Sequence, residues 1–373
     1  MILGIDASRC RSGGAISHLI GILENLHPKN YNIKEIHLWS YNSLLNRIEN
    51  KDWLIKHKSK ALNKSLIHQL YWQRFILKRL LIYNKCDLLF TADASSLCTF
   101  KNQVVFSQDL LSYEPGIERL YGLSLFRLRL ILIRWVQNKA FQKAIGVIFL
   151  SNYTSNLIQK SCGNLNNYKV IPHGVNELFF KVKKNKIISD KIVFTYVSNY
   201  DLYKNQWVVV KAIEKLNKKY NTELNLVGGG EGPAKYILEN QLKISDPKSK
   251  FVKMYDFVSH KKIIEIMKNT DIFIFASSCE TFGITLLEGM AAGMVIASSN
   301  KSSIPEIIED GGLLFDPENY LSIYNTVRSL VDNADLRLKL SKKSRKLASK
   351  YSWKRCSHET FNFIVESYIK YKN

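Results

Sequence analysis

Short apolar runs alternate with longer segments of helical periodicity along the whole chain. In the first half, apolar runs suited to buried parallel strands occupy residues 2–5, 33–38, 88–90, 104–106 and 146–150. Between them, apolar residues recur at helical spacing, for example over residues 16–26 and 66–82. Strands that alternate with helices in this way predict an α/β fold with a parallel, doubly wound sheet.

The second half of the chain repeats this rhythm. Its strand candidates are residues 192–197, 223–227, 251–254, 272–275 and 294–297. Helices are predicted over residues 206–220, 261–267 and 285–292, followed by two amphipathic helices over about 321–350 and 357–371. A second parallel, doubly wound sheet is therefore expected.

The length of 373 residues suits two domains. They join near residues 175–190, where Pro172-His-Gly-Val gives way to the polar, lysine-rich run 181–191. We predict two Rossmann-like domains, residues 1–175 and 176–350, and a C-terminal helix in residues 351–373 that packs back on the first domain. Two such domains facing each other leave a central cleft outside the carboxyl ends of their strands, where ligands bind in this architecture.

The chain carries a formal net charge of +22, of which +12 falls in residues 1–180 and +10 in residues 181–373. Within the first half the charge concentrates: residues 51–85 contain nine Lys or Arg against one acidic residue, and residues 119–143 contain six against none. These two stretches suggest docking on an anionic membrane face. The alternatives are solvated helix faces and a Lys-rich genome bias. With 46% apolar and 23% charged residues, a disordered or fibrous chain is excluded.

Six cysteines without a CxxC pair indicate a reduced, cytoplasmic protein and argue against a zinc site. The N-terminus leads directly into a strand pattern without a basic leader. No stretch of about 18 uncharged apolar residues occurs, so no targeting or membrane-spanning segment is expected. No Asp-x-Asp stands beside a strand end, and no His/Cys cluster has metal-ligand spacing. We therefore expect no divalent metal.

The strongest candidate for chemistry begins where the predicted strand 272–275 ends. A small polar turn, Ser277-Ser-Cys-Glu280, continues through Thr281-Phe-Gly283 into a helix that carries Glu288. Free backbone N–H groups at such a helix N-terminus favour phosphate oxygens. Glu280 and Glu288 could grip two separate hydroxyl-bearing parts of one ligand. The alternative is a helix-capping acid followed by a surface glutamate.

Residues 280–293, Glu-Thr-Phe-Gly-Ile-Thr-Leu-Leu-Glu-Gly-Met-Ala-Ala-Gly, resemble the Glu-x7-Glu signature of the retaining glycosyltransferases of family 4, which have the GT-B fold. Four other segments are similar to family motifs in the family's order: a linker at 170–176, a loop at 196–205, a glycine-rich turn at 227–233 and a closing segment at 304–317. The resemblance implies a retaining hexosyltransferase, and because no metal motif is found we expect it to be metal-independent. It would move a sugar from a nucleoside-diphosphate sugar, a co-substrate rather than a cofactor, to a lipid-linked or surface-glycan acceptor.

The resemblance also implies roles for individual residues, most of them in the donor-binding second domain. Lys204 and Glu280 would be catalytic: Lys204 offsets the charge that builds on the leaving diphosphate, and Glu280 contacts the transferred sugar. Glu288 would bind the ribose hydroxyls. From the residues alone, Lys204 would be read as one of many surface lysines, and Phe257 could equally be a core residue. The implied donor-binding set is Gly13, Gly14, Ser198, Asn199, Lys204, Gly229, Phe257 and Val258 along the nucleobase, Glu280, the phosphate-binding backbone of Phe282, Gly283 and Ile284, Thr285, and Glu288.

The first domain would bind the acceptor, and its signals come from two loops. The loop Asp6-Ala-Ser-Arg-Cys-Arg-Ser-Gly13-Gly14 follows the first strand and resembles the family's Gly-Gly loop, which faces both the donor phosphates and the acceptor. Gln108 and Asp109 follow a later strand and would face the acceptor. Residues 108–150 are similar to a branch that builds lipopolysaccharide O-antigen or related surface glycans. That similarity implies a peripheral location on the inner face of the bacterial cytoplasmic membrane.

Two positions depart from the family pattern. Asn199 stands where the family often has an arginine, so one phosphate-neutralising cation is missing or comes from elsewhere. Gln108 stands near the place of a common histidine, which puts a histidine base in doubt. No carboxylate for a double displacement is identified either, so front-face departure and attack is preferred. His173, in the Pro172-His-Gly turn, is interpreted as structural.

Two other classes of function stay open. The charge alone suggests a nucleic-acid-binding protein, but no helix-turn-helix, ribonucleoprotein or zinc signature accompanies it, and no nucleic-acid partner is expected. The same fold without the transfer reaction would fit a sugar-nucleotide epimerase or a catalytically silent donor-binding subunit. The asparagine at position 199 supports this second alternative.

Overall fold

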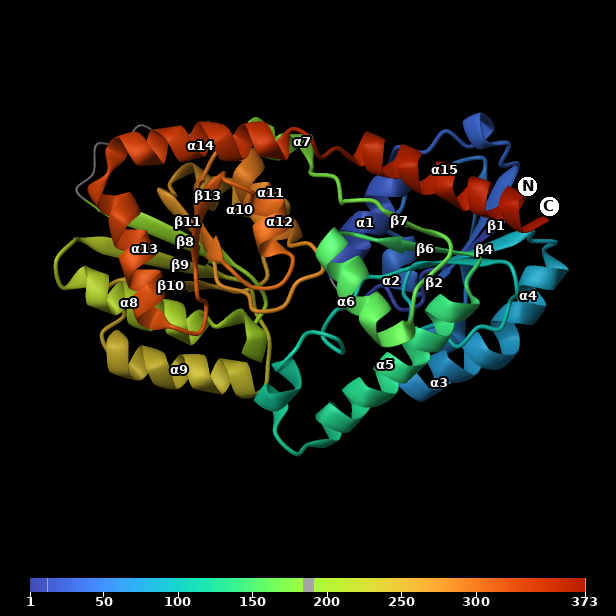
Figure 1. Ribbon diagram of the computed structural model, residues 1–373, viewed down its shortest axis with the longest axis horizontal. Helices are drawn as coiled ribbons and strands as arrows, with labels where there is room; N and C mark the ends of the chain where they lie inside the picture. The colour runs from blue at the N-terminus through green and yellow to red at the C-terminus, as the bar shows by residue number, and fades with distance from the viewer. Residues whose placement is uncertain (12, 184–190, 373) are drawn as a thin grey trace. The chain divides into compact units, whose positions relative to one another are not determined.

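The computed structural model describes residues 1–11, 13–183 and 191–372, and the chain divides into two compact units (Figure 1). The first unit comprises Met1–Gly174 and Trp353–Asn373, and the second comprises Val175–Ser352. Most of the lysine-rich run expected at the join, and Ser12 of the expected Gly-Gly loop, lie outside the described residues.

The first unit is built on a sheet of seven parallel strands in the order β3-β2-β1-β4-β5-β6-β7. In Figure 1, α1 and α15 lie on one side of this sheet, and α3 and α5 lie on the other. The strands are β1 (Ile2–Asp6), β2 (Glu35–Ser40), β3 (Leu54–Lys58), β4 (Leu88–Thr91), β5 (Gln103–Phe106), β6 (Gly146–Phe149) and β7 (Tyr168–Val170). The helices are α1 (Gly13–Glu24), α2 (Asn42–Leu45), α3 (Leu66–Tyr71), α4 (Leu77–Tyr83), α5 (Leu125–Lys143), α6 (Asn152–Cys162) and α15 (Trp353–Lys372), with a π-turn, η3 (Trp72–Ile76), between α3 and α4.

The second unit is built on six parallel strands in the order β10-β9-β8-β11-β12-β13. Helix α8 packs with α9 and α13, and α11 packs with α14. The strands are β8 (Ile192–Val197), β9 (Thr222–Val227), β10 (Val252–Tyr255), β11 (Ile272–Phe275), β12 (Val295–Ser299) and β13 (Gly312–Phe315). The helices are α7 (Glu177–Phe180), α8 (Gln206–Asn217), α9 (Pro233–Ser245), α10 (His260–Lys268), α11 (Ile284–Ala291), α12 (Ile304–Ile308), α13 (Tyr320–Asp332) and α14 (Ala334–Ala348).

The predicted α/β class with two parallel, doubly wound sheets is confirmed. All ten predicted strands are present, with ends that differ by at most two residues. The sequence patterns missed β3, β7 and β13, which are edge strands. β3 and β7 include lysines, which an edge strand tolerates because it is covered less completely than a central one, whereas β13 is a short apolar run of four residues.

One helix prediction is wrong: residues 321–350 form two helices, α13 and α14. Asn333 separates them, with extended backbone (φ −128°, ψ 96°), and its side-chain oxygen accepts a hydrogen bond from the Leu336 N–H. This bond satisfies a backbone donor at the start of α14, which stabilises a new helix start instead of a continuous helix.

The C-terminal helix α15 belongs to the first unit and packs against α1. The Ser357 hydroxyl donates a buried hydrogen bond of 2.7 Å to the Ile22 carbonyl. The indole of Trp353 lies directly over Gly21, so that a Cβ atom at this position would come within 2.4 Å of the ring. Within the described residues, no helix combines the length and the apolar character needed to cross a membrane.

Gly21→Ala should therefore weaken the α1–α15 packing, because the new methyl group forces the Trp353 indole to move. We expect the free energy of unfolding to fall by about 1–3 kcal/mol, as for other overpacked sites. Gly13→Ala in the same helix is the matched control, since a Cβ atom there meets nothing within 4 Å. Thermal unfolding followed by tryptophan fluorescence compares the two variants. A Gly21→Ala protein as stable as the control would contradict this account of the packing.

Candidate functional site

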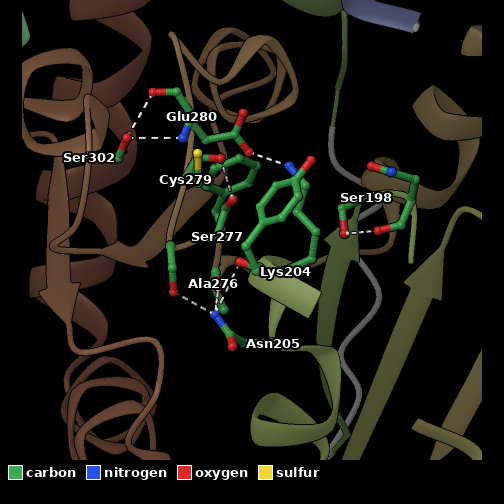
Figure 2. A network of polar contacts seen from close by, with 12 residues as sticks. Ser198, Lys204, Asn205, Ala276, Ser277, Cys279, Glu280 and Ser302 are labelled. Carbon is green, nitrogen blue, oxygen red and sulfur yellow. Dashed lines mark hydrogen bonds and ion pairs between the residues drawn. The ribbon is translucent and has the colours of Figure 1, made fainter. Parts of the chain in front are cut away.

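Two loops meet at the carboxyl edge of the second sheet, one after β8 and one after β11. Asn205 joins them: its side-chain N–H groups donate to the Ala276 carbonyl at 2.9 Å and to the Ser278 hydroxyl at 2.8 Å (Figure 2). Its backbone is left-handed, with φ 55°. Asparagine tolerates this conformation better than most residues, so it can both turn the chain and bond across the loops.

The Asn205 bridge places Lys204 beside Glu280. The Lys204 ammonium donates to Glu280 Oε1 in an ion pair whose side chains are only 9% and 16% exposed. Figure 2 shows the two side chains pointing toward one another. Lys204 is therefore not an ordinary surface lysine. Helix α11 begins after Gly283 without a side-chain cap, so Glu280 is not a helix-capping acid either.

The backbone of Glu280 is held from its other side by serines that precede α12. Its N–H donates to the Ser302 hydroxyl at 3.0 Å, and its carbonyl accepts from the hydroxyls of Ser302 and Ser303, each at 2.9 Å. The carboxylate is thus fixed through both its main chain and its ion pair. Such double support restricts the direction in which a catalytic side chain can point.

The glycine-rich turn after β9 lies against the loop that follows β8. Gly228 has φ 130°, and a Cβ atom there would lie 2.2 Å from the Ser198 carbonyl oxygen, so only glycine fits. The Tyr200 N–H donates to the Gly229 carbonyl at 2.8 Å. The Gln206 amide donates to the Ser198 hydroxyl and the Asn199 carbonyl, each at 2.8 Å. The predicted residues Ser198, Asn199 and Gly229 therefore lie together with Lys204.

Phe257 extends this group of residues as an exposed aromatic ring. It is 74% exposed, and its ring lies over Gly229, where an added Cβ atom would come within 2.9 Å of it. The core-packing interpretation of Phe257 is therefore wrong. An aromatic face that is open beside a glycine turn can stack on a flat ring of a ligand. Val258, the next residue, is half-buried.

Glu288 lies on α11 and is 5% exposed, so the surface-glutamate interpretation is wrong. Burial raises the pKa of its carboxyl to about 8. The helix itself starts directly after a left-handed Gly283 (φ 92°), with Phe282 buried before it and Ile284 and Thr285 in its first turn. A helix N-terminus of this kind presents backbone N–H donors to anions.

The remaining predicted residues belong to the first unit. Gly13 and Gly14 begin α1 after β1, and Gln108 and Asp109 follow β5, at the same carboxyl edge of the sheet. Asp109 accepts a hydrogen bond of 2.9 Å from the Leu111 N–H, and burial raises the pKa of its carboxyl. Because these residues and Lys204 lie in different units, a pocket that combines them stays a prediction.

His173 is buried in the first unit, and its Nδ1 lies 3.0 Å from Nδ1 of His18. Burial lowers the pKa of His173 to about 3, so the ring is neutral at physiological pH. These contacts agree with a structural role. Among the described residues, no group of three His, Cys, Asp or Glu side chains is arranged to hold a metal ion.

The residues that connect the site were not found from the sequence. Asn205, Gln206 and Ser302 make the hydrogen bonds that hold the Lys204 and Glu280 loops. The one available signal was an asparagine immediately before a predicted helix, a position where this residue often turns the chain. Its partners are about 70 residues away in the sequence, so no local pattern points to them.

The two sheets together define the fold of the protein. Two parallel Rossmann-like sheets in succession constitute the GT-B fold, and solved structures share it along almost the whole chain. Sucrose-phosphate synthase from Thermosynechococcus elongatus aligns with a TM-score of 0.78 at 16% identity, over 96% of this chain and 97% of that one. The Anabaena protein HepE, in a complex with UDP-glucose, aligns with a TM-score of 0.72 at 17% identity, over 97% of this chain and 99% of that one.

The match to a known protein family lies in the second unit. Residues 179–347 match the family model described as glycosyl transferases group 1. The O-antigen chain mannosyltransferase B of Escherichia coli is 30% identical over 90 residues, or 24% of either chain. The aligned segments span between a quarter and about half of the length of the curated relatives that the chain matches.

Lys204→Met leaves the Glu280 carboxylate mostly buried without its ion-pair partner. We expect the free energy of unfolding to fall by about 2–3 kcal/mol. Adding Glu280→Gln to this variant should recover part of the loss, because the double variant contains no unpaired charge. Chemical denaturation of the two single variants and the double variant measures the coupling. If the effects simply add, the pair does not hold the loops as described.

The matched control is the more exposed pair between Lys218 and Glu214, whose side chains are 74% and 30% exposed. Lys218→Met should leave the denaturation midpoint almost unchanged, since exposed ion pairs contribute little to stability.

Glu288 should make stability depend on pH. Because its folded-state pKa is about 8 and the unfolded value is near 4.5, the folded protein holds a proton that the unfolded chain releases in this window. The free energy of unfolding should therefore decrease as the pH rises from about 5 to about 8. Glu288→Gln carries a neutral amide and should flatten this decrease. Urea midpoints across the window compare the two proteins, and equal slopes would contradict the assignment.

Proposed function

We propose that this protein is a retaining, metal-independent glycosyltransferase. It transfers a hexose-type sugar from a nucleoside-diphosphate sugar to a hydroxyl of a lipid-linked or cell-surface glycan precursor. The observation that carries the proposal is the ion pair between Lys204 and Glu280, held at the carboxyl edge of the second sheet beside a glycine turn. A cation and a carboxylate placed side by side can bind the two adjoining parts of such a donor, the cation its diphosphate and the carboxylate its sugar.

Lys204 acts on the diphosphate. As the bond to the sugar breaks, negative charge builds on the leaving phosphate, and a fixed ammonium stabilises that charge more than it stabilises the bound donor. The N–H groups at the start of α11, around Gly283, hold further phosphate oxygens. Once Lys204 has turned to the diphosphate, Glu280 is released to accept hydrogen bonds from sugar hydroxyls.

Glu288 and Phe257 recognise the nucleoside. The carboxyl of Glu288 binds the ribose hydroxyls, and its raised pKa keeps it mostly neutral until a ligand supplies hydrogen bonds. The exposed ring of Phe257 stacks on the nucleobase. The complex of HepE with UDP-glucose, a protein of the same fold, supports this class of donor.

The acceptor binds the first unit, with Gln108 and Asp109 on its side. The O-antigen mannosyltransferase among the relatives supports a lipopolysaccharide, O-antigen or capsule precursor as the acceptor class. Such acceptors are lipid-linked, so the enzyme works as a peripheral protein on the inner face of the cytoplasmic membrane. Transfer with retention proceeds by departure and attack on one face of the sugar, assisted by the leaving phosphate.

A second candidate is a sugar-nucleotide epimerase or a catalytically silent donor-binding subunit. The observation that favours it is Asn199, an exposed residue at the position where the family that the chain resembles often has an arginine. Lys204 would then be the one cation that the motif supplies in this loop. The protein could bind the donor but would stabilise the leaving diphosphate too weakly for efficient transfer.

The test starts with thermal shifts in a panel of UDP-, GDP- and dTDP-sugars, since a preferred donor stabilises the folded protein by mass action. Transfer from that donor is then measured in Lys204→Met and Glu280→Gln. We expect kcat/KM to fall by about 100-fold or more in each. Lys211→Met, an exposed lysine on α8, is the matched control and should transfer at the unaltered rate.

The product distinguishes the candidates. Proton NMR should show the anomeric configuration of the donor preserved in the new linkage, and an inverted anomer would overturn the retaining assignment. An epimerised nucleotide sugar without transfer would establish the epimerase. Donor stabilisation with neither product would establish the silent subunit.

A further inference from the structure

Helix α5 has two apolar faces, and only one of them is buried. Leu130 and Phe141 pack into the first unit, together with the amide of Gln137. The opposite face is open to solvent, and its side chains recur at helical spacings of three and four residues. This outer face consists of Leu125, Leu128, Ile131, Leu132 and Trp135, which are between 53% and 86% exposed.

Cations are concentrated along α5 and the segment just before it, although one of them, Arg134, lies on the inner side of the helix and donates to the Ser112 carbonyl. Residues 119–143 contain six Lys or Arg and no acidic residue, and among the described ion pairs none involves one of these six. The Lys139 ammonium lies over the Trp135 ring, 3.5 Å from its centre. An exposed apolar stripe bordered by cations binds an anionic lipid surface, because the stripe enters the acyl boundary and the cations meet the headgroups.

The segment from α3 through η3 to α4, in the same unit, has similar character. Ile67, Tyr71, Phe75, Ile82 and Tyr83 are more than half exposed on it. Residues 51–85, which include this segment, contain nine cations against one acidic residue. The π-turn also directs the buried Gln73 inward, where its amide donates to Asp6 and Ser8 in the loop after β1.

The inner side of α5 is bonded to loops at the carboxyl edge of the first sheet. Asn138 Oδ1 accepts a hydrogen bond of 2.9 Å from the Tyr113 hydroxyl, and the Arg134 guanidinium donates to the Ser112 carbonyl. The Gln137 amide donates to the Ser95 hydroxyl at 3.1 Å, in the loop after β4. The helix with the exposed stripe therefore also supports the loop that begins with Gln108.

We propose that the outer face of α5 docks on an anionic lipid bilayer, and that docking steadies the loop of residues 108–116. The proposal deepens the function proposed above by naming the surface that meets the membrane, and it rests on that function in assigning the loop to the acceptor. A second copy of the chain is a poor occupant of this face, because pairing two such faces would bring like charges together. A bilayer with anionic headgroups complements both the apolar stripe and the cations.

Co-sedimentation with phosphatidylcholine vesicles, with and without phosphatidylglycerol, tests the docking surface. We expect binding that needs the anionic lipid and weakens with added salt. The variant Leu128→Ser/Leu132→Ser/Trp135→Ser should bind about tenfold more weakly, since it removes apolar area that enters the bilayer. Tyr236→Ser/Ile244→Ser on α9 is the matched control, because these residues are 67% and 75% exposed but lie in the other unit.

Equal binding to neutral vesicles, or unchanged binding by the α5 variant, would overturn the proposal. A dimer in sedimentation velocity that the α5 variant abolishes would assign this face to a second copy instead. Donor thermal shifts in the same variants separate this proposal from the first. A variant that loses vesicle binding but keeps the donor-induced thermal shift has lost the docking face alone. If the unaltered protein and every variant lack a donor-induced thermal shift, the proposed function fails, whatever the vesicle result.

Hydrogen exchange tests the link to the loop. Vesicles should slow amide exchange in residues 108–116 of the unaltered protein. Asn138→Ala removes the bond to Tyr113 without changing charge, so it should still bind vesicles but lose most of this protection. Exchange in the loop that does not respond to vesicles would show that α5 docks without steadying it.

Discussion

Asn205 connects two loops that come from strands far apart in the sequence, and the arrangement of the second unit's site depends on that connection. Its amide reaches Ala276 and Ser278, while its neighbour Lys204 reaches Glu280. Without the bridge, a buried ammonium and a mostly buried carboxylate would each lack a partner, and an unpaired charge away from water is costly. The hydrogen bonds of Asn205 thus keep Lys204 and Glu280 paired. The pair in turn supplies the charged groups that the loops present to a ligand.

The sequence predicted the parts of the molecule that are governed by local regularity. Buried central strands need continuous apolar runs, so their positions were correct to within two residues, whereas the edge strands β3 and β7 include lysines and were missed. The division between α13 and α14 depends on the backbone of one residue, Asn333, which periodicity does not detect. The exposed ring of Phe257 could not be distinguished from a core residue because burial depends on distant chain segments.

The site shows the same limit in another form. Motif spacing identified Lys204, Glu280 and the glycine turn, because these residues lie in short, recognisable segments. It did not identify the bonds of Asn205, Gln206 and Ser302, which are formed only after the sheet has assembled. The first unit provides a parallel case, since the polar contacts that support the loop after β5 come from α5, and neither the charge of this segment nor its family similarity pointed to them.

The pairing of Lys204 with Glu280 also bears on how a reaction cycle ends. In the empty site each charge already has a partner, so a small stray anion gains little by binding to the lysine. An intact donor can engage both side chains at once, through its diphosphate and its sugar. After the sugar has left, Glu280 loses its ligand and can return to Lys204, in competition with the remaining diphosphate. The same contact that orders the site before binding would then hasten the departure of the spent nucleotide.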